Sequence, residues 1–240
     1  MAIRLETASQ QTANNGVKIL VHGRSGMGKT VLSATLGQRT IMVSAEAGAL
    51  SLQRKNLERI YGVGNPDINY DMHIIVVETV SDFHDAYDWI MSEYGKAYEA
   101  VAIDSLSEIA EKILANEKAK NKDGRMAYGN AAEEIEKIVR KFRDIPNKTV
   151  YMSAKTEMLV DGNGGGMKYF PMMPGKKTGQ ILDYFFDEVF YFDTYKHDDG
   201  KVYRVLHTQV NDTFTAKDRS GALDAMEAPN LSAIIRKIKG

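Results

Sequence analysis

Residues 17–30 read VKILVHGRSGMGKT, and this stretch decides how the rest of the chain is interpreted. It opens with a short, largely apolar run that predicts a buried strand. Gly23, Gly28, Lys29 and Thr30 then complete the pattern G-x-x-x-x-G-K-[ST]. In this pattern backbone N–H groups converge on phosphates, the lysine reaches the outer phosphates and the hydroxyl suits Mg2+. We therefore expect a nucleoside triphosphate site in residues 23–30, which we call the phosphate loop.

The composition is that of a globular chain without a strong charge bias. Its 240 residues fit one α/β domain. Lys and Arg (31) nearly balance Asp and Glu (32), so a nucleic-acid surface would have to be a local patch. There is no cysteine, and the five histidines lack ligand spacing. No apolar run reaches the roughly 20 residues of a membrane span, and no signal segment is evident, so we expect a cytoplasmic protein with no membrane partner.

Residues 1–16 are polar and lack a regular period. We divide the chain into this flexible N-terminal arm and one domain over residues 17–240. The arm either stays disordered or adds a strand to a neighbouring subunit.

Two carboxylates follow apolar strands downstream of the phosphate loop. Residues 40–44 lead to Glu46, and residues 100–103 lead to Asp104. Open α/β sheets bind their ligands at the carboxyl ends of strands. Asp104 therefore has the expected place for holding Mg2+. Glu46 is either the base that positions an attacking water or a carboxylate that faces a helix N-terminus.

The remaining periodic segments alternate between helix and strand. Helices are expected near residues 31–36, 49–61, 81–94, 106–114 and 132–142 and after Pro229, with Ser81 as an N-cap. Further strands are expected near residues 73–77 and 149–153, with hairpins at 157–170 and 188–207.

Two basic segments that contain aromatic residues are candidates for contact with nucleic acid. Residues 117–129 are polar and punctuated by glycine, and we interpret them as a loop that is either solvated or bound to DNA. The hairpin at 157–170 and its return segment combine charge with aromatic rings. The candidate DNA-binding residues are Lys118, Lys120, Lys122, Arg125, Tyr128, Lys168, Tyr169, Phe170, Lys176 and Lys177.

The order of these motifs resembles the RecA/RadA-type recombinase core. It is most similar to the small phage-encoded ATPases of that fold, which act in single-strand annealing or recombination. The resemblance rests on the phosphate loop, on V-S-A-E at 43–46, on A-I-D-S at 102–105 and on K-D-R-S-G at 217–221. It implies an α/β fold with a RecA-like P-loop core: a mostly parallel central sheet flanked by helices, with antiparallel C-terminal strands.

The resemblance also implies roles for individual residues, with ATP and Mg2+ as ligands. The implied catalytic residues are Lys29, Glu46, Lys217 and Arg219. Glu46 activates water. Lys217 and Arg219, which we call the finger pair, are similar to the lysine-x-arginine finger that related ATPases insert into the site of a neighbouring subunit. The implied metal-binding residues are Thr30 and Asp104. The implied nucleotide contacts are Gly23, Ser25, Gly26, Met27, Gly28, Lys29, Thr30 and Val31, with Arg54 in place of an adenine-stacking tyrosine.

One position departs from the pattern. Lys155 stands where RecA-like proteins usually have a glutamine that senses the γ-phosphate. An ammonium cannot accept a hydrogen bond, so a signal from nucleotide to DNA would need different contacts here.

The expected function is a Mg2+-dependent, DNA-stimulated ATPase that forms a ring or filament of identical subunits. It would bind single-stranded DNA and promote annealing or recombination, with a single-strand-binding protein as a further candidate partner. The alternative is a nucleotide-dependent switch or assembly ATPase that acts on a protein, which the near-zero net charge favours. A GTPase is disfavoured because N-K-D at 121–123 lacks N-K-x-D spacing, and no arginine-rich lid of a nucleotide kinase is evident.

Overall fold

The computed structural model describes residues 5, 7, 16–46, 48–162 and 166–240. Most of the predicted N-terminal arm therefore lies outside the described residues. The described strands are β1 (Lys18–Gly23), β2 (Thr40–Ser44), β3 (His73–Val76), β4 (Ala100–Asp104), β5 (Thr149–Ala154), β6 (Thr156–Val160), β7 (Met167–Pro171), β8 (Glu188–Lys196), β9 (Val202–His207), β10 (Lys217–Asp218) and β11 (Met226–Glu227). Every strand expected from the sequence is present.

The central sheet is mostly parallel. Its strand order is β11-β9-β8-β1-β5-β4-β2-β3, and β10 pairs with β8 beside this path. The strands from β8 to β3 in this order run parallel to one another. β9, β10 and β11 join in antiparallel fashion, and β6 and β7 form a separate antiparallel hairpin. This confirms the predicted α/β fold with antiparallel C-terminal strands.

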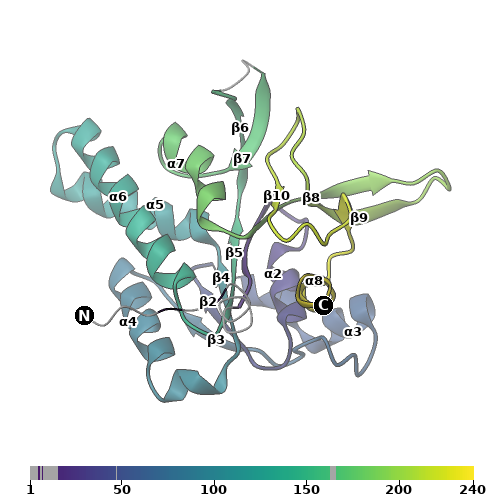
Figure 1. Cartoon of the computed structure of the whole chain (residues 1–240). Coiled ribbons are helices and arrows are strands. Elements are labelled where there is room, and N and C mark those ends of the chain that lie inside the picture. Colours follow the sequence, from purple (N-terminus) through teal and green to yellow (C-terminus); the bar gives the residue numbers. More distant parts are fainter. Residues whose placement is uncertain (1–4, 6, 8–15, 47, 163–165) are drawn as a thin grey trace.

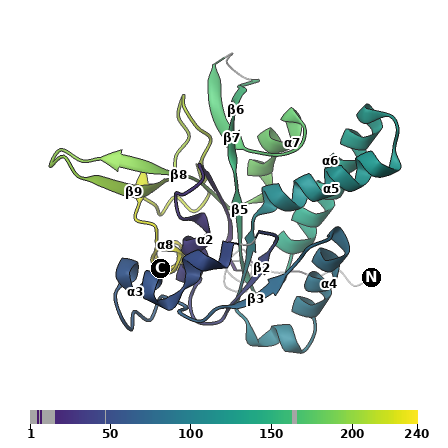
Figure 2. The same ribbon diagram turned by 180° about the vertical axis from the view of Figure 1, so that it is seen from behind.

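Helices cover both faces of the sheet (Figures 1 and 2). On one face lie α4, α5 and α6, and on the other lie α2, α3 and α8. The helices are α2 (Lys29–Ser33), α3 (Arg54–Tyr61), α4 (Val80–Met91), α5 (Leu106–Lys120), α6 (Gly124–Arg143), α7 (Lys176–Ile181) and α8 (Leu231–Lys239). Short 3-10 turns are η1 (Ala34–Leu36), η2 (Gly48–Leu52), η3 (Tyr94–Ala97) and η4 (Leu182–Phe185). No helix in the described part of the chain is long and apolar enough to cross a membrane.

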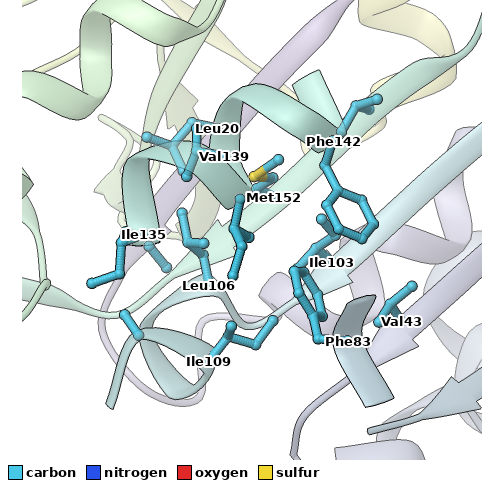
Figure 3. Close-up of a cluster of buried hydrophobic side chains, with 14 of the residues drawn as sticks. Leu20, Val43, Phe83, Ile103, Leu106, Ile109, Ile135, Val139, Phe142 and Met152 are labelled. Atoms are coloured by element: carbon cyan, nitrogen blue, oxygen red, sulfur yellow. The ribbon is translucent and has the colours of Figure 1, made fainter. Parts of the chain in front are cut away.

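The larger core lies between the sheet and helices α4 to α6 (Figure 3). β1, β4 and β5 are buried along their whole length, which explains why they read as nearly continuous apolar runs. The rings of Phe83 on α4 and Phe142 on α6 stack with their centroids 4.5 Å apart. This packing holds the parallel strands rigid up to the edge where the two predicted carboxylates lie.

The N-cap of helix α4 lies two residues before Ser81, the predicted N-cap. Thr79 is the N-cap, and its hydroxyl accepts a hydrogen bond from the Asp82 N–H at 3.2 Å. The Asp82 carboxylate accepts in turn from the Thr79 N–H at 2.8 Å, which completes a capping box. Ser81 was the wrong choice because only Thr79 has an acidic side chain three residues later to complete the box.

The interpretation of residues 117–129 as a loop is wrong. They are helical except for a connection at 121–123 between α5 and α6. The Asp123 carboxylate accepts from the Arg125 N–H at 2.8 Å and caps α6. Gly124 and Gly129 lie on the exposed side of α6, while Ala127 is fully buried. Burial of one face therefore outweighs the low helix propensity of glycine in this segment.

Candidate nucleotide-binding site

The phosphate loop joins the end of β1 to the start of α2. Gly26 and Gly28 have φ angles of +79° and +106°, a region that favours glycine. A Cβ on Gly23 would lie 2.6 Å from the carbonyl oxygen of Phe192 on β8. The three glycines are therefore required by the path of the chain. Around them, Ser25 is exposed, Met27 is half-buried and Val31 is buried.

Lys29 folds back over the phosphate loop. Its Nζ donates to the carbonyl oxygens of Gly23 at 2.7 Å and Arg24 at 3.0 Å. Burial lowers the pKa of the Lys29 ammonium, and the nearby carboxylates of Asp104 and Glu46 oppose that shift. Among the described residues no carboxylate forms an ion pair with it. Its charge therefore remains available for an anion bound in the phosphate loop.

Thr30 and Asp104 meet as the sequence predicts. The Thr30 hydroxyl donates to Asp104 Oδ2 at 2.6 Å, and the Ser153 hydroxyl donates to Oδ1. Burial raises the pKa of the Asp104 carboxyl, and these hydrogen bonds oppose the rise. A hydroxyl and a carboxylate are oxygen donors of the kind Mg2+ prefers. Within the described residues no cluster of three or more His, Asp or Glu side chains could hold a metal.

Glu46 lies at the same edge of the sheet. β2 and β4 are neighbours with Ser44 opposite Asp104, so the residues that follow the two strands are close. Glu46 Oε1 accepts from the Ser105 hydroxyl at 2.5 Å. The geometry therefore favours a place in the site for Glu46 over a purely capping role, although its role in catalysis stays a prediction.

Lys155 and Arg54 each have partners outside the phosphate loop. Lys155 Nζ pairs with Glu108 Oε2 at 2.9 Å and with Glu111 Oε1 at 3.5 Å, which ties the end of β5 to α5. The hydrogen bond that Lys155 donates to the Glu108 carboxylate raises the pKa of Lys155. The Arg54 guanidinium lies 5.4 Å from the centroid of the Tyr70 ring and pairs with Glu58. Its assignment as an adenine contact stays a prediction.

The finger pair lies far from its own phosphate loop. Lys217 is opposite Val189 on β8, and Val189 is opposite Leu20 on β1. Arg219 pairs at 2.8 Å with Asp187, and the Asp187 N–H bonds to the carbonyl oxygen of Lys18 at the start of β1. At 3.3 Å per residue, the start and end of β1 are about 16 Å apart. That is further than an arginine side chain reaches, so Arg219 in this position does not contact the phosphate loop of its own subunit.

A buried glutamate packs beside the finger pair. Glu188 is 1% exposed and is opposite Asp218 in the β8–β10 pairing. Burial, followed by the charge of Asp218, raises the pKa of Glu188 to about 8. Asp218 meanwhile accepts from the N–H groups of Gly221 at 3.0 Å and Leu223 at 3.1 Å. A protonated Glu188 therefore allows Asp218 to stay charged and to anchor the segment that carries Arg219.

This arrangement predicts a pH-dependent effect of Glu188→Gln. The folded protein holds the Glu188 proton more tightly than the unfolded chain, so the free energy of unfolding of the wild type falls as the pH rises from about 4.5 to about 8. Glutamine has no proton to lose and places no charge beside Asp218. Urea unfolding should show little difference at pH 5 and a gain of about 1 to 3 kcal/mol for the variant at pH 9. Glu133→Gln, at an exposed position on α6, is the control, and its free energy of unfolding should differ from that of the wild type by the same amount at pH 5 and pH 9. A constant difference across the range would refute this reading of Glu188.

The β6–β7 hairpin contacts the phosphate loop, but its candidate DNA-binding residues are largely occupied. Arg24 Nη2 donates to the Tyr169 hydroxyl at 2.9 Å, and the Tyr169 ring stacks on Tyr191 at 5.6 Å. Lys168 pairs with Asp161 at 2.9 Å. Phe170 is only 7% exposed, so its ring has no free face for a base, and this corrects its assignment. Lys177 is exposed, and the side chain of Lys176 lies outside the described part of the structure.

His22, the last residue before the phosphate loop, is buried against the same hairpin. Its Nε2 lies 2.9 Å from the carbonyl oxygen of Thr215, and its Nδ1 lies 3.1 Å from the Thr156 hydroxyl. Burial lowers the pKa of His22 to about 4. A neutral ring therefore joins the end of β1 to the hairpin and to the segment that leads to Lys217.

The other basic set lies around the connection between α5 and α6, and we call it the α5–α6 tip: Lys118, Lys120, Lys122, Arg125 and Tyr128. Lys122 and Arg125 are exposed, as is 42% of Tyr128. Lys118 Nζ lies 5.0 Å from the Tyr128 ring centroid, and Lys120 pairs with Glu117 at 2.8 Å. The structure therefore brings Lys118 and Tyr128 together and places all five residues on a helical hairpin rather than a loop. Figure 1 shows this hairpin as a separate projection from β6–β7.

Four residues of the site were not identified from the sequence. Ser153 and Ser105 hold the carboxylates of Asp104 and Glu46, and the Tyr151 hydroxyl donates to the carbonyl oxygen of Lys29 at 2.8 Å. Their position at the carboxyl ends of β5 and β4 was the available signal. Arg204 on β9 donates to the carbonyl oxygen of Gly26 at 3.4 Å. No local pattern marks it, because a strand pairing brings it to the phosphate loop.

Comparison with known proteins agrees with this site. A search of curated proteins gives no match. A family model described as an AAA domain matches residues 15–220, which include the phosphate loop, both carboxylates and the finger pair. The match covers most of the chain, and the chain therefore belongs to this family of AAA-type P-loop ATPases.

Proposed function

We propose that this protein is a Mg2+-dependent ATPase that assembles with copies of itself, binds single-stranded DNA and promotes annealing or recombination. The observation that carries the ATPase part is the meeting of Lys29, Thr30 and Asp104 at one edge of the sheet, with Glu46 beside them. A bound Mg2+ would neutralise charge on the phosphates.

The residues of the chain supply the rest of the chemistry. The backbone N–H groups of the phosphate loop and the Lys29 ammonium bind the phosphates. Asp104 and Thr30 supply oxygen donors to the metal. Glu46 orients the water that attacks the γ-phosphate and accepts its proton. Ser105 supports this role because its hydroxyl holds the Glu46 carboxylate in place.

The DNA-binding part rests on the α5–α6 tip. It combines exposed cations with an exposed tyrosine ring, the pair of features that single-stranded nucleic acid contacts require. The competing proposal is a nucleotide-dependent switch that acts on a protein. The burial of Phe170 and the ion pair of Lys168 favour this competitor, because they remove two residues from the expected DNA surface.

Anisotropy of a labelled single-stranded oligonucleotide, with and without ATP and Mg2+ at several salt concentrations, tests the proposal. We expect salt-dependent binding, with a log-log slope that falls by about 0.7 when Lys122 or Arg125 is replaced by alanine. Lys201→Ala, an exposed cation on the β8–β9 turn, is the matched control and should leave the slope unchanged. ATP hydrolysis without oligonucleotide binding would support the protein-directed switch.

A further inference from the structure

We infer that Arg204 contacts the nucleotide bound by its own subunit, on the side of the α-phosphate. This inference rests on the proposed nucleotide site and adds a residue to it. Arg204 lies on β9 opposite Thr194 of β8, and β8 lies next to β1, with Phe192 opposite Gly23. The pairing therefore brings β9 within side-chain reach of the phosphate loop.

The guanidinium of Arg204 lies against the middle of the phosphate loop. Nη2 donates to the carbonyl oxygen of Gly26 at 3.4 Å, and a Cβ on Gly28 would lie 3.4 Å from Nη1. Both glycines belong to the turn whose N–H groups converge on phosphate. A positive side chain in this position adds to the attraction of the phosphate loop for an anion.

The charge of Arg204 is not neutralised within the subunit. Among the described residues no carboxylate pairs with it, and its hydrogen bond to Gly26 is long and therefore weak. Six other described arginines form ion pairs with carboxylates, whereas Arg24, Arg59 and Arg125 share with Arg204 the lack of one. The paired arginines are Arg39, Arg54, Arg140, Arg143, Arg219 and Arg236. A phosphate oxygen would accept a shorter, charge-assisted hydrogen bond than the Gly26 carbonyl can. Exchange of the carbonyl for a phosphate is therefore favourable.

The strand order indicates which part of the nucleotide Arg204 contacts. Asp104 and Glu46 follow β4 and β2, which lie on the β5 side of β1, whereas β9 lies on the β8 side. The γ-phosphate belongs beside Asp104, Glu46 and Lys29, because hydrolysis takes place there. Arg204 approaches from the opposite side and therefore meets the α-phosphate, which ATP and ADP share.

Titration of the full chain with fluorescent mant-ADP and mant-ATP, in the presence of Mg2+, tests this inference. Arg204→Ala should weaken binding of both nucleotides by a similar factor of about 10 to 100, the loss expected for one charge-assisted hydrogen bond. Turnover at saturating ATP should change by less than about threefold, because the contact is made equally in the ground and transition states. Arg204→Lys should recover part of the affinity. Lys196→Ala, an exposed cation on the same hairpin, is the matched control and should bind as the wild type does.

Each alternative outcome has a definite meaning. Wild-type affinity of a folded Arg204→Ala protein for both nucleotides would overturn the inference and leave the proposed ATPase standing. A loss confined to mant-ATP, with reduced turnover, would place Arg204 at the γ-phosphate and overturn its assignment to the α-phosphate. Failure of the wild type itself to bind either nucleotide would refute the proposed function together with the inference. Thermal unfolding of each variant identifies any that fail to fold, and Arg204→Gln then replaces Arg204→Ala.

Discussion

Glu46→Gln is expected to bind ATP with nearly wild-type affinity and to hydrolyse it about 100 to 10,000 times more slowly. The Glu46 carboxylate accepts a hydrogen bond from Ser105 beside the Thr30–Asp104 pair, where it can receive a proton from the attacking water. Glutamine keeps the size of the side chain and its hydrogen bond to Ser105. It cannot act as a base, so the loss should appear in turnover rather than in binding.

Two further variants show whether the loss of turnover is specific to Glu46. Lys29→Ala should lose nucleotide affinity as well as turnover, because its ammonium contacts the phosphates in the ground state. Glu133→Gln, which changes an exposed carboxylate on α6, is the matched control and should hydrolyse ATP normally. Phosphate release and mant-ATP binding measured on the same preparations separate the two steps. Wild-type turnover by Glu46→Gln would contradict the catalytic role of Glu46 and favour the alternative, a carboxylate that faces a helix N-terminus.

The nucleotide site could be predicted from the sequence because its parts are local. The phosphate loop is a continuous motif, and Glu46 and Asp104 each follow a buried apolar strand. In a parallel sheet the carboxyl ends of strands share one edge, so residues at the ends of two strands can lie close together although many positions separate them. The pairing of Ser44 with Asp104 realises that expectation.

The features that the sequence did not reveal depend on packing between distant segments. Phe170 lies between Tyr169 and Pro171 on β7, and no pattern in this stretch shows that its ring is buried. Residues 117–129 carry two glycines and many charges, and within them Ala127 alone is buried, at the start of the buried face of α6. Arg204 reaches Gly26 through a hairpin that starts more than 160 residues later, at Glu188. None of these contacts has a local sequence signal.

The position of the finger pair leads to the second large prediction. Arg219 is tied to Asp187 at the start of β8, at the opposite end of β1 from the phosphate loop. More than half of the Arg219 side chain is exposed in this ion pair, and exposed ion pairs contribute little to the free energy of unfolding. A guanidinium so placed can leave Asp187 at low cost and reach a neighbouring subunit. A trans contact with the γ-phosphate would also make hydrolysis depend on assembly.

Arg219→Ala is therefore expected to reduce turnover by about 1,000 to 100,000 times, as loss of a trans-acting arginine does. When it is mixed with Lys29→Ala, turnover should rise at least about a hundredfold above either protein alone. In a mixed assembly an intact phosphate loop of one variant meets an intact finger of the other. Phosphate release, with the state of assembly followed by analytical ultracentrifugation, measures this recovery.

Asp187→Asn separates the trans role from a structural one. It removes the charge that holds Arg219 within its own subunit but leaves the guanidinium in place. If Arg219 acts in a neighbouring site, Asp187→Asn should keep or raise the turnover. If Arg219 serves only its own ion pair, Asp187→Asn should reproduce the loss seen in Arg219→Ala, and the mixture with Lys29→Ala should show no recovery even where assembly is intact. The trans proposal therefore requires opposite behaviour from the two partners of one ion pair, whereas a structural role requires the same behaviour from both.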